Sequence, residues 1–155
     1  MSADATIPVA RSVWMPPHFY VLYTLAGVGL HFAVGGPRLL HLPWLGMALL
    51  VPGGALTVWG ARTFAAAGTT LKPFERTSTL VVTGPFRFTR NPMYLGLVTM
   101  LFGATLCLAT PALWLAALAL PVTLQLRFVR HEERALAASF GESYERYCRS
   151  VRRWI

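Results

Sequence analysis

Long apolar runs separated by short polar stretches dominate the pattern along this 155-residue chain. A helix needs about 20 apolar residues to cross the hydrocarbon core of a bilayer, and four runs approach that length. The pattern predicts transmembrane helices over residues 17–36, 43–61, 92–109 and 111–127. Only the short turn at Thr110-Pro111 separates the third and fourth runs, so these two should form a helical hairpin. We therefore expect an all-α integral membrane protein in which residues 1–155 form a single domain.

The longest polar connection covers residues 62–91 and contains several Gly and Pro turn signals. Connections of this length are uncommon in compact domains and are often functional. We expect a folded cytoplasmic connection here, with a brief β-like run at Leu80–Thr83.

The last segment, residues 128–153, is strongly charged but keeps an apolar stripe. Its aromatic and aliphatic residues recur at alternating steps of four and three, which places them on one face of a helix. These are Phe140, Tyr144, Tyr147, Val151 and Trp154. The segment should form a C-terminal amphipathic helix that lies on the membrane surface or caps the bundle, with an interruption at Gly141 that separates it from a piece continuing the fourth apolar run.

Composition supports the membrane assignment. Hydrophobic residues make up 55% of the chain and charged residues only 13%, which is too apolar for a soluble domain of this size. The net charge of +8 comes without a basic soluble module, so we expect no nucleic-acid binding. With four spans, Arg38 is the only Lys or Arg on one side of the membrane. The positive-inside rule then places both termini in the cytoplasm and the protein in the inner, cytoplasmic membrane.

The first candidate site lies where the polar connection meets the third apolar run, at Thr83–Gly96. Asn91 should cap this helix through its side-chain oxygen, and Pro92 suits the first helical position because it lacks the N–H that would be left unbonded there. The positive end of the helix dipole, together with Arg87 and Arg90, would bind an anion. Alternatively, these residues are ordinary anchors at a membrane interface.

A second polar cluster follows the fourth apolar run and contains Arg127, Arg130, His131, Glu132 and Glu133. Adjacent carboxylates at a membrane boundary are costly unless they are paired or hold a cation. The cluster is either a self-neutralising set of salt bridges or part of a binding site. In the predicted topology it reaches the same face as the first cluster.

Aromatic residues near both clusters add flat faces that stabilise cations and bases: Phe86, Phe88, Tyr94, Tyr144 and Tyr147. Anion donors, carboxylates and aromatic faces together suit a ligand with a carboxylate, an ammonium, a sulfonium and a flat base. We expect no metal site.

The order of motifs resembles the isoprenylcysteine carboxyl methyltransferase and phospholipid methyltransferase superfamily. The resemblance covers about residues 68–153 and rests on Gly68-Thr69, Pro73, Leu80-Val81-Val82-Thr83-Gly84-Pro85-Phe86-Arg87, Arg90-Asn91-Pro92-Met93-Tyr94-Leu95-Gly96, an apolar hairpin, Glu132-Glu133, Leu136, Phe140-Gly141, Tyr144 and Tyr147. It implies an integral membrane enzyme that transfers a methyl group from S-adenosylmethionine to a lipophilic acceptor from the bilayer.

The resemblance also implies which residues line the cofactor pocket: Arg90, Asn91, Pro92, Tyr94, Glu132 and Glu133. To these we add Gly84, Phe86, Arg87, Tyr144 and Tyr147 as cofactor-binding candidates. Arg87 or Arg90 would hold the methionyl carboxylate, and Glu132 would bind the ammonium or lie beside the sulfonium. If the acceptor needs a general base, Glu133 or His131 is the nearest candidate. Arg90, Glu132 and Glu133 are thus the expected catalytic residues.

The acceptor stays open among an isoprenylcysteine-like carboxylate, a phospholipid amine and a small thiol. Two other functions are also compatible with the sequence. One is an NADPH-dependent membrane reductase related to the sterol reductases, which have a similar N-P-x-Y motif. The other is a non-enzymatic membrane scaffold in which the charged clusters serve only as anchors.

Overall fold

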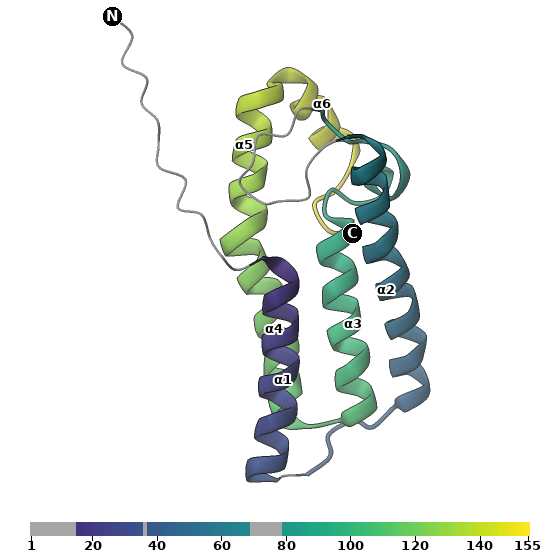
Figure 1. The fold of residues 1–155 in the computed structure, drawn as a ribbon, viewed down its shortest axis with the longest axis vertical. Helices are drawn as coiled ribbons and strands as arrows, with labels where there is room; N and C mark the ends of the chain where they lie inside the picture. The colour runs from purple at the N-terminus through teal and green to yellow at the C-terminus, as the bar shows by residue number, and fades with distance from the viewer. Residues whose placement is uncertain (1–14, 36, 69–78) are drawn as a thin grey trace, which may run out of the picture.

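A computed structural model describes residues 15–35, 37–68 and 79–155, and it is helical throughout its regular part. The elements are α1 (Pro16–Val34), α2 (Pro43–Ala66), the 3-10 helix η1 (Gly84–Arg87), α3 (Pro92–Leu108), α4 (Pro111–Leu124), the π-helical segment η2 (Gln125–Val129), α5 (Arg130–Phe140) and α6 (Glu142–Ser150). Helices α1 to α4 lie side by side, and α5 and α6 extend beyond one end of this bundle (Figure 1). The expected all-α fold is confirmed for the described residues.

Proline starts each of the four long helices, at Pro16, Pro43, Pro92 and Pro111. Its fixed φ suits the first helical position, where the missing N–H costs nothing. The α3–α4 hairpin forms as expected, because Ala109 adopts a left-handed φ of 57° and the Thr110 side chain accepts a hydrogen bond from the Leu113 N–H at 3.2 Å. Proline therefore predicts where each of these helices begins.

Glycines bring α2 and α3 into backbone contact. The two helices run antiparallel (Figure 1), and Gly53 and Gly46 of α2 meet Gly96 and Gly103 of α3. A Cβ atom on Gly53 would lie 2.9 Å from the Gly96 carbonyl oxygen, and one on Gly103 would lie 2.7 Å from the Gly46 carbonyl oxygen. Small residues at such interfaces allow close van der Waals packing between membrane helices.

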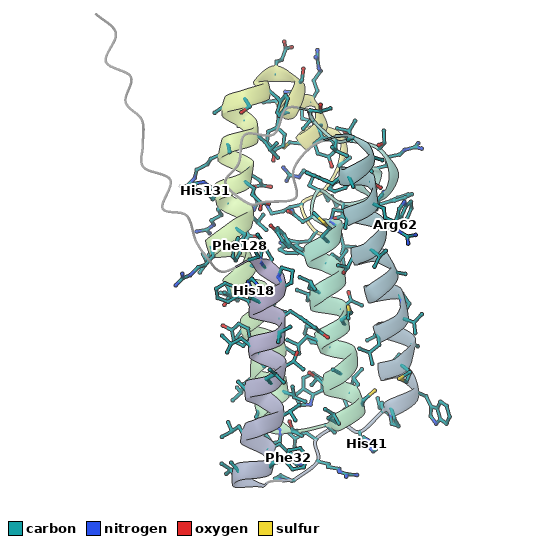
Figure 2. All side chains as sticks on the ribbon, in the orientation of Figure 1. His18, Phe32, His41, Arg62, Phe128 and His131 are labelled. Atoms are coloured by element: carbon teal, nitrogen blue, oxygen red, sulfur yellow. The ribbon has the colours of Figure 1, made fainter. Side chains whose placement is uncertain are left out.

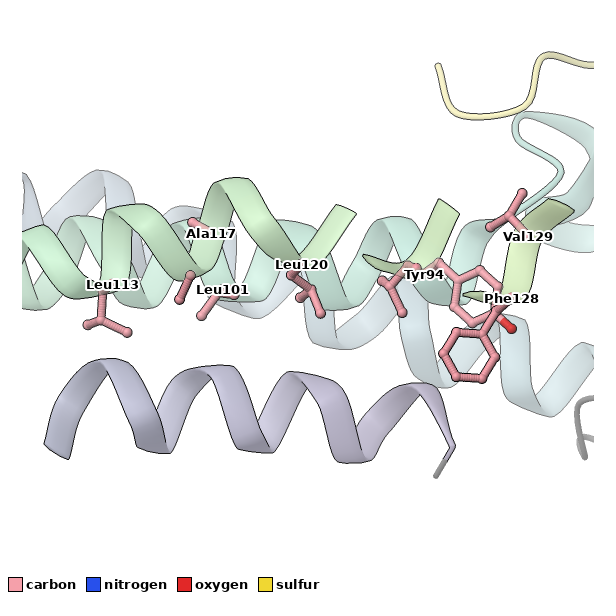
Figure 3. Close-up of a cluster of buried hydrophobic side chains, with 9 residues drawn as sticks. Tyr94, Leu101, Leu113, Ala117, Leu120, Phe128 and Val129 are labelled. Carbon is pink, nitrogen blue, oxygen red and sulfur yellow. The ribbon is translucent and has the colours of Figure 1, made fainter. Parts of the chain in front are cut away.

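The core lies mainly between α1, α3 and α4, and it continues upward to the start of α3. Figure 3 shows Leu113, Leu120 and Phe128 on the side of α4 and η2 that faces α1, with Leu101 and Tyr94 of α3 beside them. All but Tyr94 are almost completely buried, and Tyr94 is 7% exposed. This packing fixes where Tyr94 enters the site described below.

The outer surface of the bundle carries many large apolar side chains. Trp44 is 88% exposed, Val51 67% and Leu115 68%. Exposed apolar side chains in such number are expected where lipid replaces water. Within the described residues, Pro43–Ala66 and the continuous helix Pro111–Phe140 are long and apolar enough to cross a membrane, judged by length and composition only, and Pro92–Leu108 is a shorter apolar helix. Four spans stay a prediction.

Two local expectations were wrong. Leu80–Thr83 forms no strand and runs as irregular backbone into η1. Helix α2 continues to Ala66, past the predicted end at residue 61. As expected, the first part of the segment 128–153 continues the fourth apolar run, because α4 passes without a break through η2 into α5. The predicted interruption at Gly141 is confirmed: this residue takes a φ of 49°, which glycine adopts readily, and separates α5 from α6.

Candidate active site

A pocket lies at the end of the bundle where α3 begins, under α5 and α6. It encloses about 590 Å³ of empty space when the part open to solvent is included. Its lining brings together nine of the predicted site residues: Phe86, Arg90, Asn91, Pro92, Tyr94, Glu132, Glu133, Tyr144 and Tyr147. The two polar clusters of the sequence therefore converge on one pocket, although the residues between them form a long apolar hairpin.

Tyr94 and Glu132 are in direct contact at the floor of this pocket. The Tyr94 hydroxyl donates a hydrogen bond to Oε1 of Glu132 at 2.5 Å. The Tyr94 ring packs on Phe128, with ring centroids 6.4 Å apart, which holds the hydroxyl in place. The contact joins the first turn of α3 to α5 and occupies one of the two carboxylate oxygens of Glu132.

The π-helical segment η2 helps to set which residues of α5 face the pocket. Here the Arg130 N–H bonds to the Gln125 carbonyl, five residues back. A π turn adds about one residue to a helical turn, so every later side chain is rotated by roughly 100° compared with an unbroken α-helix. Glu132 and Glu133 line the pocket, where His131 and Glu132 would face it in an unbroken α-helix.

Glu133 forms ion pairs with two arginines. Its Oε1 lies 3.3 Å from Nη1 of Arg90 and accepts a hydrogen bond from Nε of Arg153 at 2.9 Å, and its Oε2 lies 2.7 Å from Nη2 of Arg153. Arg153 therefore binds both oxygens of the carboxylate. The salt bridges that we considered for this cluster do exist at Glu133, but their partners come from the start of α3 and from the C-terminus.

Arg90 keeps a hydrogen-bond donor that no described residue uses. Its side chain is 15% exposed, and Nη1 also donates to Sγ of Cys148. The Nε atom is buried and has no hydrogen-bond partner among the described residues. Buried N–H groups are nearly always paired in proteins, so this donor is a candidate contact for a ligand in the pocket.

The role expected for the Asn91 side chain was wrong. Asn91 is the residue before the first turn of α3, but its side chain makes no capping hydrogen bond. Instead its amide Nδ2 donates to the Arg153 carbonyl oxygen at 2.9 Å. An asparagine amide can donate as well as accept, and a carbonyl from a distant segment competes for it.

An aromatic wall closes one side of the pocket. Phe86 is 4% exposed and Tyr144 5%, and the Tyr147 hydroxyl donates to the Phe86 carbonyl oxygen at 2.7 Å. Burial raises the pKa of the Tyr147 phenol well above its usual range, so this hydroxyl stays protonated and keeps donating. Phe88, in contrast, is 72% exposed.

Three of the predicted residues are not in the pocket lining. Gly84 has a φ of 58° and packs against Thr63 of α2, Arg87 is exposed on η1, and His131 is exposed on the side of α5 that faces away from α3 (Figure 2). The roles suggested for these residues stay predictions.

The pocket also contains residues that the sequence did not single out for it. They are Phe64, Thr79, Leu80, Val81, Met93 and Leu136, all apolar except Thr79. Leu80, Val81 and Leu136 belong to the motifs on which the resemblance rests, so motif spacing could have identified them. Phe64 could not be found that way, because it comes from the part of α2 that extends past its predicted end.

Known proteins similar to this chain indicate its family. The phospholipid methyltransferase family matches residues 42–143, which include α2, α3, α4 and most of the pocket. An uncharacterized protein of Haemophilus influenzae is 35% identical over 63 residues, which are 41% of this chain and 100% of that protein. No solved structure matches. The chain belongs to the phospholipid methyltransferase family, a family of membrane methyltransferases.

Proposed function

We propose that the protein uses S-adenosylmethionine to methylate a lipophilic acceptor at the cytoplasmic face of the membrane. The contact between Tyr94 and Glu132 carries this proposal. It places a carboxylate from α5 in the same pocket as the arginine at the start of α3, in a chain whose family transfers methyl groups. A purely anchoring role for the two clusters does not require them to share a pocket.

The residues present fit the charged groups of this cofactor. Arg90 has a buried Nε donor for the methionyl carboxylate, and the helix start beside it adds a positive potential. Glu132 provides negative charge for the ammonium or the sulfonium. The aromatic faces of Phe86 and Tyr144 suit the flat adenine and the positive sulfonium.

The chain's own contribution to the reaction is mainly positioning. The sulfonium of the bound cofactor supplies an activated methyl group with a good leaving group. Tyr94 orients Glu132, Arg90 fixes the amino-acid end, and the aromatic wall excludes water, so that the acceptor meets the methyl group in line.

The surroundings of the carboxylates favour an acceptor that arrives as an anion, such as a carboxylate or a thiolate. A general base must be free to take a proton. Arg153 contacts both oxygens of Glu133 and Arg90 contacts one of them, and Glu132 already accepts a hydrogen bond from Tyr94. His131 is exposed outside the pocket lining. A carboxylate acceptor needs none of these groups as a base.

The test is thermal stabilisation of the purified protein in detergent. S-adenosylhomocysteine at about 100 times its Kd should add about 2.7 kcal/mol to the free energy of unfolding, while NADPH should add nothing. Glu132→Gln should lose most of this stabilisation, and Glu142→Gln, on the exposed surface of α6, should keep it. Stabilisation by NADPH alone would support a reductase, and stabilisation by neither nucleotide would support a scaffold.

A further inference from the structure

The C-terminal tail, residues 151–155, folds back from α6 onto the start of α3. The Arg152 carbonyl accepts a hydrogen bond from the Arg90 backbone N–H at 2.9 Å, and the Arg153 carbonyl accepts from Asn91 Nδ2 at 2.9 Å. Trp154 packs against the buried core, and its Nε1 donates to Oε1 of Gln125 at 3.0 Å. The backbone of the tail is thus held in place without any contribution from the Arg153 guanidinium.

That guanidinium instead competes with Arg90 for a single carboxylate. Arg153 contacts both oxygens of Glu133, at 2.9 and 2.7 Å, whereas Arg90 makes one longer contact at 3.3 Å. A two-point guanidinium–carboxylate pair is the stronger arrangement, because both N–H groups point along acceptor directions. The negative charge of Glu133 is therefore neutralised chiefly from the tail side.

We propose that Arg153 is a positioning residue for the nucleotide site: by holding Glu133, it leaves Arg90 able to bind the carboxylate of the cofactor's amino-acid end. Without Arg153, Glu133 would pair fully with Arg90, which is itself only 15% exposed. An arginine neutralised in this way attracts a second carboxylate less strongly. This inference rests on the proposed function, and it gives the tail a part in ligand selection.

The experiment measures the affinity of the full-length protein for two ligands that differ only at the amino-acid end. S-adenosylhomocysteine carries the carboxylate, and 5′-methylthioadenosine lacks the whole amino-acid moiety. We expect the wild type to prefer the first ligand by about tenfold or more, as for a charge-assisted hydrogen bond. Arg153→Ala should lower the affinity for S-adenosylhomocysteine by about tenfold and change that for 5′-methylthioadenosine by less than about twofold.

A second substitution separates positioning from simple support of the fold. In the double variant Arg153→Ala with Glu133→Gln, no carboxylate competes for Arg90, so most of the preference for S-adenosylhomocysteine should return. Arg152→Ala is the matched control. It removes an exposed positive charge one residue away but keeps the carbonyl that bonds to Arg90, so the preference should stay as in the wild type.

Each other result would overturn the inference. An equal loss for both ligands in Arg153→Ala, or no recovery in the double variant, would show that Arg153 only supports the fold. If the wild type binds S-adenosylhomocysteine and Arg153→Ala keeps the same preference for it over 5′-methylthioadenosine, this inference is wrong and the proposed function is unaffected. A wild type that binds neither ligand would reject both.

Discussion

At the scale of single residues, the hydroxyl of Tyr94 has a role that its ring does not share. Tyr94→Phe removes the donor to Glu132 and keeps the ring contact with Phe128. Without this donor Glu132 is no longer held in its place in the pocket, so we expect the affinity for S-adenosylhomocysteine to fall by about tenfold, as measured by titration calorimetry. Tyr23→Phe removes the hydroxyl that contacts Thr123 between α1 and α4 and should leave this affinity unchanged. An unchanged affinity in Tyr94→Phe would contradict the role given to the contact.

Residue types at the site were predictable from the sequence, but their partners were not. Arg90, Tyr94 and Glu132 stand out because polar groups are rare next to long apolar runs. The bond from Asn91 to the Arg153 carbonyl joins residues 62 positions apart, and no local pattern indicates it. Asparagine directly before Pro92 favours an N-cap, but the side chain of Asn91 makes this tertiary hydrogen bond instead.

At the scale of elements, the contact between α2 and α3 depends on glycine. A Cβ atom on Gly96 would lie 2.5 Å from the Gly53 carbonyl oxygen, which is backbone and cannot move aside. Gly96→Ala should therefore lower the free energy of unfolding by about 1–3 kcal/mol, the usual cost of overpacking, and lower the Tm in detergent. Gly29→Ala in α1 is the matched control, because nothing lies within 4 Å of its added Cβ and alanine favours the helix. Equal Tm values for the two variants would exclude close packing at Gly96.

The helices themselves were largely predictable, because proline at the first position and uninterrupted apolar runs mark their beginnings and extents. The π-helical segment η2 was not. Its residues, Gln125–Val129, carry no composition that distinguishes a π turn from an α turn, and the extra residue is accommodated by packing of Phe128 and Val129 in the core. This turn helps to decide whether Glu132 or His131 faces the pocket, so helix periodicity alone could not choose between them, whereas the resemblance singled out Glu132 and Glu133.

At the scale of the whole molecule, the site lies at one end of the bundle and the α1–α2 connection at the other (Figure 1). This separation arises because α2 and α3, like α3 and α4, run antiparallel, so the end of α2, the start of α3 and the helix after α4 all reach the same face. Positive charge is also divided unequally between the two ends, because Arg38 is the one arginine in the connections at the end opposite the site. Under the positive-inside rule this distribution of charge would place the site on the cytoplasmic side, and that orientation stays a prediction.

Cysteine labelling tests this topology directly. In a variant that lacks both native thiols, Cys107 and Cys148, a single new cysteine is placed either at Arg38 or at Ser143, which are both exposed. With four spans and a cytoplasmic site, a membrane-impermeant maleimide should label the Arg38→Cys protein in intact cells and the Ser143→Cys protein only in inverted vesicles, because about 30 Å of hydrocarbon separates the two positions. The cysteine-free background should give no signal in either preparation. Labelling of both positions from the same side would mean that the bundle does not cross the membrane as four spans, and the site would then have to take its lipophilic acceptor from a surface rather than from within the bilayer.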